Sequence, residues 1–160
     1  NEIDSFDELA ARADAAVIQF NGLGDSIKAA EQRMQEIAAL KKHIINYSKT
    51  REVYVAYRKA GYSKKFLEGH REAITLHKAA KEAFEQLGLK KLPRVKELNA
   101  EYAQLLEQKR AAYPAYRKAR TEMQEYLVAQ KVAALLLDQE KEQAAIEERR
   151  KEEQRTDPHR

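Results

Sequence analysis

The sequence has 160 residues, of which 43% are hydrophobic and 35% charged, and it contains no cysteine. The missing cysteine excludes disulfides, thiolate metal ligands and a cysteine nucleophile, and no apolar run approaches the ~18 residues that a membrane-spanning helix needs. Only 5 Gly and 3 Pro are present, and most other residues are strong helix formers. We therefore expect an all-α protein with few turns and much exposed helix surface.

The net charge of +4 is unevenly distributed along the chain. Residues 1–40 carry 3 basic and 8 acidic side chains, and residues 97–160 carry 12 basic and 13 acidic ones. Residues 41–96 carry 15 basic and 5 acidic side chains. Such a basic block favours a surface that meets a polyanion. The alternative is a lysine-rich face that only keeps the protein in solution.

The first predicted element is a helix over about residues 4–60, here called arm one. Apolar residues recur in it at alternating steps of three and four from Phe6 to Ile37. This spacing is typical of a coiled-coil seam, which faces a partner helix. Gly22 and Gly24 lower the helix propensity without shifting the heptad phase, so we predict one continuous helix. A break at these glycines is the competing possibility.

A shorter basic helix, helix two, is predicted over about residues 63–87. Gly61 is expected to end arm one, because glycine is the preferred residue after a helix C-terminus. Ser63 is placed to cap the start of helix two. Gly88 is expected to close it before the loop that leads into the next arm.

Arm two is predicted over about residues 94–137, where apolar residues again alternate by three and four from Val95 to Leu137. Pro114 lies within this pattern and predicts a kink, because proline removes one backbone hydrogen bond. Residues 138–160 are almost entirely polar. We expect them to form a charged, partly disordered tail.

One apolar stripe is not stable alone in water, so each arm needs a partner helix. The simplest solution is a single domain over residues 1–137, a long antiparallel coiled-coil hairpin with the shorter basic helix at one end. Pairing between chains is the alternative that heptads permit equally well.

The basic middle supplies the candidate nucleic-acid contacts. Their cations are expected to bind phosphates without base specificity, and an aromatic ring among cations can stack on a base. The candidates are Lys49, Arg51, Arg58, Lys59, Tyr62, Lys64, Lys65, Arg71, Lys78, Lys81, Lys90, Lys91 and Arg94.

No pattern indicates catalysis, a metal or a cofactor. His70 and His77 lie seven residues apart, which is too far to chelate one ion from a single helix. No phosphate-binding glycine loop or nucleophile elbow is present. We therefore expect no enzyme activity, no cofactor, no metal and no small-molecule substrate in this chain.

Three segments carry a resemblance to a known family: HIINYSKTR (43–51), YVAYRKAGYSKKF (54–66) and ITLHKAAKEAF (74–84). Over roughly residues 25–137 the chain resembles the C-terminal helical region of relaxase/mobilization nucleases from bacterial conjugative and mobilizable elements. The family's nuclease domain nicks DNA with a tyrosine and holds a metal with a histidine cluster. This chain lacks such a cluster, so no tyrosine here is assigned that role.

The resemblance implies an accessory region of a relaxase that acts in plasmid or transposon mobilization. Because the chain starts with Asn1 and not Met, we expect a piece of a longer protein. We also expect a cytoplasmic location. DNA, single- or double-stranded, is the expected partner of the basic middle, with no membrane insertion. The alternative is a purely structural coiled-coil module that docks a transfer-apparatus protein or dimerises.

Overall fold

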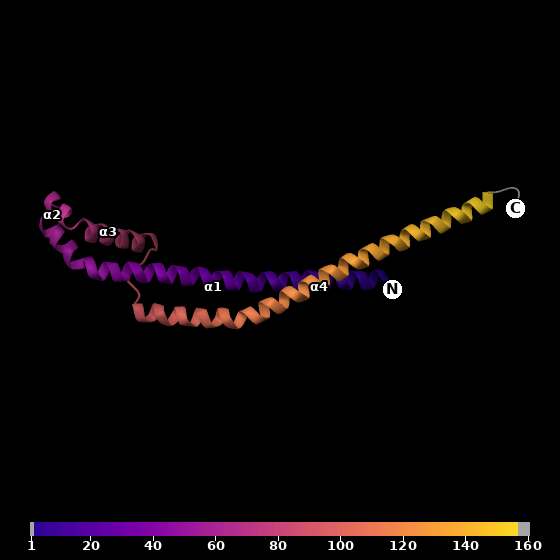
Figure 1. Ribbon diagram of the computed structural model, residues 1–160, viewed down its shortest axis with the longest axis horizontal. Coiled ribbons are helices and arrows are strands. Elements are labelled where there is room, and N and C mark those ends of the chain that lie inside the picture. Colours follow the sequence, from indigo (N-terminus) through magenta and orange to yellow (C-terminus); the bar gives the residue numbers. More distant parts are fainter. Residues whose placement is uncertain (1, 157–160) are drawn as a thin grey trace. The chain divides into compact units, whose positions relative to one another are not determined.

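The computed structural model describes residues 2–156, with side chains from Asp4 onward. Its four helices follow in chain order in Figure 1: α1 (Glu2–Lys59), α2 (Lys64–Gly69), α3 (Arg71–Gln86) and α4 (Val95–Thr156). No strand occurs in these described residues, so the predicted all-α class is confirmed. Within the same residues, no helix is long and apolar enough to cross a membrane.

The chain forms two compact units, and both contain parts of α1 and α4. Unit 1 combines α1 up to Ser26 with α4 from Ala112 onward. Unit 2 is Ile27–Ala111, which contains the rest of both long helices together with α2 and α3. The single domain over residues 1–137 stays a prediction.

Unit 1 is held together by small and aromatic residues of its two helices. Phe20 of α1 stacks on Tyr116 of α4, with ring centroids 5.0 Å apart. A Cβ atom at Gly24 would lie 3.4 Å from the Tyr116 ring, so the absent side chain lets the ring lie close to the α1 backbone. Buried alanines allow similarly close helix contact elsewhere in the unit: Ala13, Ala16 and Ala119.

Unit 2 has the larger apolar core, because three helices meet there. Its buried cluster joins Ile37 and Leu40 of α1, Ala80 and Phe84 of α3, and Leu98 of α4. Figure 1 shows α3 lying alongside α1 in this unit. Half-buried residues from the helices and the connecting loop pack around the cluster: Ile44, Tyr47, Leu89, Leu92 and Leu105.

Two ion pairs also join α1 to α4 in unit 2. The Arg33 guanidinium donates two hydrogen bonds to the Glu101 carboxylate, at 2.8 and 3.1 Å. Lys109 Nζ lies 3.0 Å from a Glu31 oxygen. The Arg33 pKa is raised and the Glu101 pKa lowered, chiefly by their mutual hydrogen bonds. Both side chains are about two-fifths exposed, so solvent screens much of this attraction.

The predicted continuity of arm one is confirmed. The α1 helix runs from Glu2 to Lys59 without interruption at Gly22 or Gly24. Gly22 has no neighbouring atom within 4 Å of an added Cβ, so its cost is limited to low helix propensity.

Helix two differs from its prediction, because the structure divides it into α2 and α3. Ser63 caps α2 as expected, and its Oγ accepts a hydrogen bond from the Phe66 N–H at 3.4 Å. The division falls at His70, which has non-helical angles of φ −133 and ψ 29. The preceding residue, Gly69, is a poor helix former, which explains why the helix is interrupted at this point.

Arm two also differs, because α4 continues as helix to Thr156 instead of ending near residue 137. The added segment is rich in Glu, Gln, Lys, Arg and Ala, which favour helix without an apolar stripe. Pro114 lies inside α4. The last four residues of the predicted tail, 157–160, lie outside the described residues.

Candidate nucleic-acid interface

The turn between α1 and α2 forms one end of unit 2 and presents an exposed tyrosine. The Tyr62 N–H donates to the Tyr57 carbonyl, and the Gly61 N–H to the Arg58 carbonyl, both at 3.1 Å. This pair of bonds is the Schellman ending of a helix. Gly61 has φ +66, as that ending requires, and Tyr62 also has a positive φ, of 60. A left-handed conformation is unusual for a bulky residue and costs about 1 kcal/mol or more.

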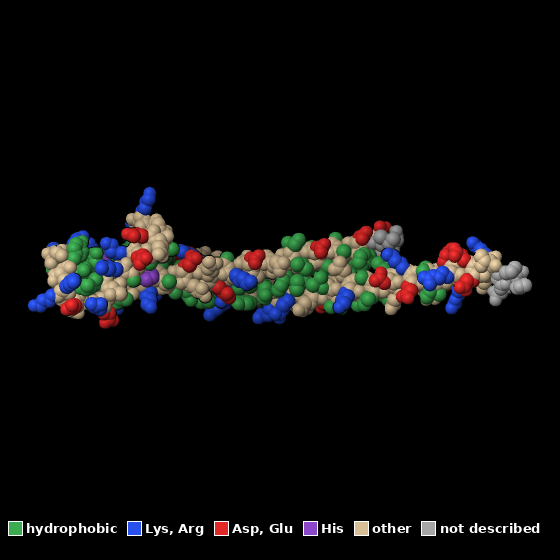
Figure 2. All heavy atoms as spheres, turned by 90° about the horizontal axis from the view of Figure 1, so that it is seen from above, with side chains coloured by type: hydrophobic (Ala, Val, Ile, Leu, Met, Phe, Trp, Pro, Cys, Tyr) green, Lys and Arg blue, Asp and Glu red, His purple; other side chains and the backbone are tan. Residues whose placement is uncertain are grey.

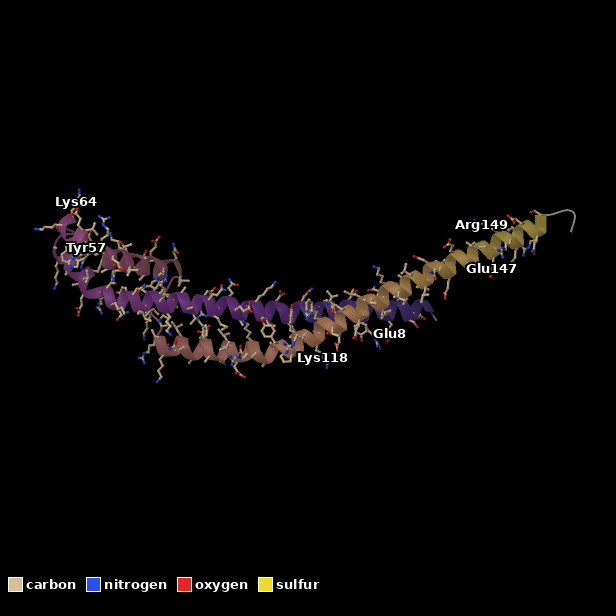
Figure 3. The ribbon with its side chains drawn as sticks, viewed as in Figure 1. Glu8, Tyr57, Lys64, Lys118, Glu147 and Arg149 are labelled. Atoms are coloured by element: carbon tan, nitrogen blue, oxygen red, sulfur yellow. The ribbon has the colours of Figure 1, made fainter. Side chains whose placement is uncertain are left out.

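Tyr62 is 54% exposed, whereas the neighbouring aromatic residues pack inward. Its ring meets the buried Tyr57 edge-on, with centroids 5.2 Å apart. Tyr57 also stacks on Phe66 of α2 at 6.0 Å. Figure 3 shows Tyr57 and Lys64 at this end of unit 2. The contact with Tyr57 explains how Tyr62 is held in place, while its exposed part stays accessible to a ligand.

A buried histidine of α3, His77, packs against α1 near this turn. The His77 ring is stacked between Tyr47 and Tyr54, with centroid distances of 4.7 and 4.3 Å. The Thr50 hydroxyl donates to the Asn46 carbonyl at 2.6 Å and lies 3.0 Å from His77 Nδ1. Because the hydroxyl hydrogen is already used, His77 Nδ1–H donates to Thr50 Oγ1. Burial, and secondly the charge of Lys81, lower the pKa of His77. This histidine is therefore a neutral packing residue.

All thirteen predicted candidates lie in unit 2, and all are exposed. Tyr62 in the turn and Lys64 and Lys65 at the start of α2 form what we call the tip. The other candidates lie in α1 (Lys49, Arg51, Arg58 and Lys59), in α3 (Arg71, Lys78 and Lys81) and in the loop before α4 (Lys90, Lys91 and Arg94). Figure 2 shows Lys and Arg side chains gathered at the end of unit 2 that holds α2, beside exposed apolar atoms.

Within the described residues, none of the twelve cations among these candidates forms an ion pair with an acidic side chain. In the part of the chain that the structure describes, the ion pairs involve other cations: Arg12, Arg33 and Lys109. Two candidates instead lie over aromatic rings, Lys78 at 5.8 Å from the Tyr57 centroid and Lys81 at 5.2 Å from that of Tyr54. Their aromatic contacts fix the position of two positive charges on the surface of α3.

The loop before α4 contributes to a different kind of surface. A groove of about 690 Å³ there is lined by apolar residues together with Lys91 and Arg94. Glu97 and Glu101 also line it, so an anion in this groove would meet both signs of charge. The tip and α3 are therefore the better phosphate surface.

Within the described residues, no group of three or more His, Asp or Glu side chains converges. Comparison with known proteins found no family model, no curated protein and no solved structure that matches this chain. The absence of catalysis stays a prediction.

Sequence reasoning missed the stacked position of His77. The spacing only excluded His70 and His77 as a chelating pair, whereas His77 is 3% exposed and His70 lies at the break between α2 and α3, stacked on Phe66 at 4.2 Å. The available signal was the spacing of Ile74, His77 and Phe84, which are all buried on one face of α3.

Proposed function

We propose that this chain is a non-catalytic accessory region of a conjugative relaxase and contacts DNA through unit 2. The observation that carries the proposal is the set of twelve exposed cations without acidic partners in the described chain. A surface of this kind attracts the phosphate backbone, and the counterions released on binding drive the association. The relaxase origin rests on the sequence resemblance, and a cytoplasmic location follows from it.

The proposed architecture is an antiparallel hairpin of α1 and α4. Within unit 2, Glu31 pairs with Lys109 whereas the later residue Leu40 packs with the earlier residue Leu98. Within unit 1, Phe20 stacks on Tyr116, and a groove brings the start of α1 to α4 residues 133–140. In both units, later residues of α1 therefore meet earlier residues of α4, as the hairpin requires.

The chemistry of the surface favours phosphate contact over base recognition. Most of its groups are lysines, which act as flexible point charges and carry no directional base pattern. Tyr62 adds an exposed ring beside Lys64 and Lys65, and a ring so placed can stack on an unpaired base. Binding is therefore expected to vary little with DNA sequence.

The proposal is tested with two double charge reversals. Lys64→Glu/Lys65→Glu removes two cations of the tip, and Arg149→Glu/Arg150→Glu removes two exposed cations of α4 in unit 1, which are distant from the tip in the sequence. Both variants change the net charge equally. Binding to fluorescent DNA, single- and double-stranded, is measured at about 50 mM salt, where phosphate contacts are strong.

We expect the tip variant to bind at least about tenfold more weakly than the unit 1 variant. Equal loss in both variants would mean that only net charge matters, and the tip would then not be the interface. No binding by the unaltered chain would leave the basic face as a surface that keeps the protein in solution. The purely structural coiled-coil module would then be the better description.

A further inference from the structure

One stretch of α4 in unit 1 carries large apolar side chains of which about half or more of the surface is exposed. Val128, Val132, Leu135 and Leu136 are 62%, 49%, 57% and 55% exposed. They follow one another at steps of four, three and one, so they form a stripe along the helix. We call these four residues the α4 stripe. A helix of a monomeric protein normally exposes polar residues at such positions.

The stripe is distinct from the face of α4 that meets α1. Ala133 and Leu137 line the groove shared with Phe6 and Leu9 of α1. At ~3.6 residues per turn, the line through Val128, Val132 and Leu135 lies roughly on the opposite side of the helix from those two residues. Leu136 lies between the two faces and also lines the groove. The stripe is therefore available to a second molecule while α1 stays in place.

The heptad positions of the stripe allow it to pack against the same stripe of a second copy of this chain. Steps of four and three place Val128 and Leu135 at d positions and Val132 and Gln139 at a positions. When two such helices pack antiparallel, a faces d. Val132 then meets Leu135 of the second copy, and the two-fold axis repeats the same contact.

Charge favours the same antiparallel register. The flanking g positions are Lys131 and Asp138, both exposed. In the antiparallel pair, Lys131 faces Asp138 of the second copy, and symmetry makes this opposite-charge contact twice. In a parallel pair, Lys131 would instead face Leu136, without a charge partner. Beyond the stripe, Glu125 would face Glu142 of the second copy, so the favourable contact ends there.

We propose that the chain self-associates through the α4 stripe as an antiparallel pair centred between Ala133 and Ala134. The contact spans residues 128–139, or about 18 Å of helix. A helix contact of this length buries less surface than a standard interface, which buries ~800 Å² per partner. The dimer is therefore expected to be weak and to exchange rapidly. The proposal does not depend on DNA binding.

The oligomeric state of the full chain tests the proposal in the absence of DNA. Analytical ultracentrifugation over protein concentrations up to about 1 mM covers the range of weak association. We expect a reversible monomer–dimer equilibrium, weakened at least about tenfold by Val132→Glu. Ile18→Glu is the matched control, because Ile18 is a 72% exposed apolar residue of unit 1 that lies on α1, outside the stripe. A monomer at every concentration, or equal weakening by both variants, would overturn the proposal.

Cysteine cross-linking tests the register, and the chain contains no native cysteine. The antiparallel pair brings Val128 next to Gln139 of the second copy but separates the two Val128 residues by about 16 Å. Mild oxidation should therefore link Val128→Cys/Gln139→Cys into covalent dimers and leave Val128→Cys monomeric. Efficient linking of Val128→Cys alone would indicate a parallel pair and refute the proposed register.

Discussion

Replacement of Ile37 by alanine tests the packing of unit 2. Ile37 is 1% exposed and lies in the cluster formed with Leu40, Ala80, Phe84 and Leu98. It therefore sits where α1, α3 and α4 meet. Loss of its side chain leaves a cavity that rigid neighbouring helices fill only partly.

The expected cost is about 2–5 kcal/mol of unfolding free energy, the range for a fully buried Ile→Ala change. This is a large fraction of the ~5–15 kcal/mol that stabilises a typical domain. Ile45→Ala is the matched control, because Ile45 lies in the same helix and the same unit but is 37% exposed. Its removal should cost about half as much or less, since fewer of its atoms leave water on folding.

Urea unfolding followed by far-UV circular dichroism measures both variants, and the difference in unfolding free energy follows from the midpoint and slope. Equal costs for Ile37→Ala and Ile45→Ala would show that Ile37 is not at the centre of a packed core. The three-helix arrangement of unit 2 would then be refuted.

Three further outcomes follow from individual contacts. Burial lowers the pKa of His77 below its ordinary 6.5, so the unfolded chain binds more protons than the folded chain, and the free energy of unfolding should fall as pH drops from about 6.5 toward that lower pKa. Urea titrations at about pH 8 and about pH 5.5 should show a smaller fall in His77→Phe than in the unaltered chain. An unchanged fall in His77→Phe would contradict this expectation. Gly61→Ala should destabilise the protein by about 1 kcal/mol, because Gly61 has φ +66. Gly22→Ala, in the open helix, should instead stabilise it by up to about 1 kcal/mol. Thermal melts in which both variants shift the melting temperature in the same direction would contradict the assigned backbone. A double-mutant cycle on Arg33 and Glu101 should give a coupling of at most about 1 kcal/mol, because both are partly exposed, and a clearly larger value would indicate a buried pair.

The sequence was sufficient to predict the long helices, because their stability depends on propensity and heptad spacing along the chain. The seam from Phe6 to Ile37 predicted α1 through two glycines, and Gly61 and Gly88 predicted the turns where the structure has positive φ. Exposure of the candidate cations also followed, since charged side chains on long helices remain solvated.

Other features depended on tertiary contacts or on weak local preferences. The helix is interrupted at His70, next to Gly69, which is a poor helix former. The sequence alone does not indicate that Gly69 will interrupt a helix while Gly22 does not. The apolar seam stops near residue 137 and therefore predicts the end of arm two there, although helix propensity carries the helix on to Thr156. The burial of His77 depends on Tyr47 and Tyr54, which reach it from another helix.

The salt dependence of DNA binding by the full chain tests the central claim most directly. If the cations of unit 2 bind phosphates, the logarithm of the binding constant should fall linearly with the logarithm of salt concentration, by about 0.9 for each phosphate contact on duplex DNA. Several contacts are expected, and Lys64→Glu/Lys65→Glu should make the slope shallower while Arg149→Glu/Arg150→Glu leaves it unchanged. Absence of binding at about 50 mM salt, or a slope near zero, would contradict a DNA-contacting role.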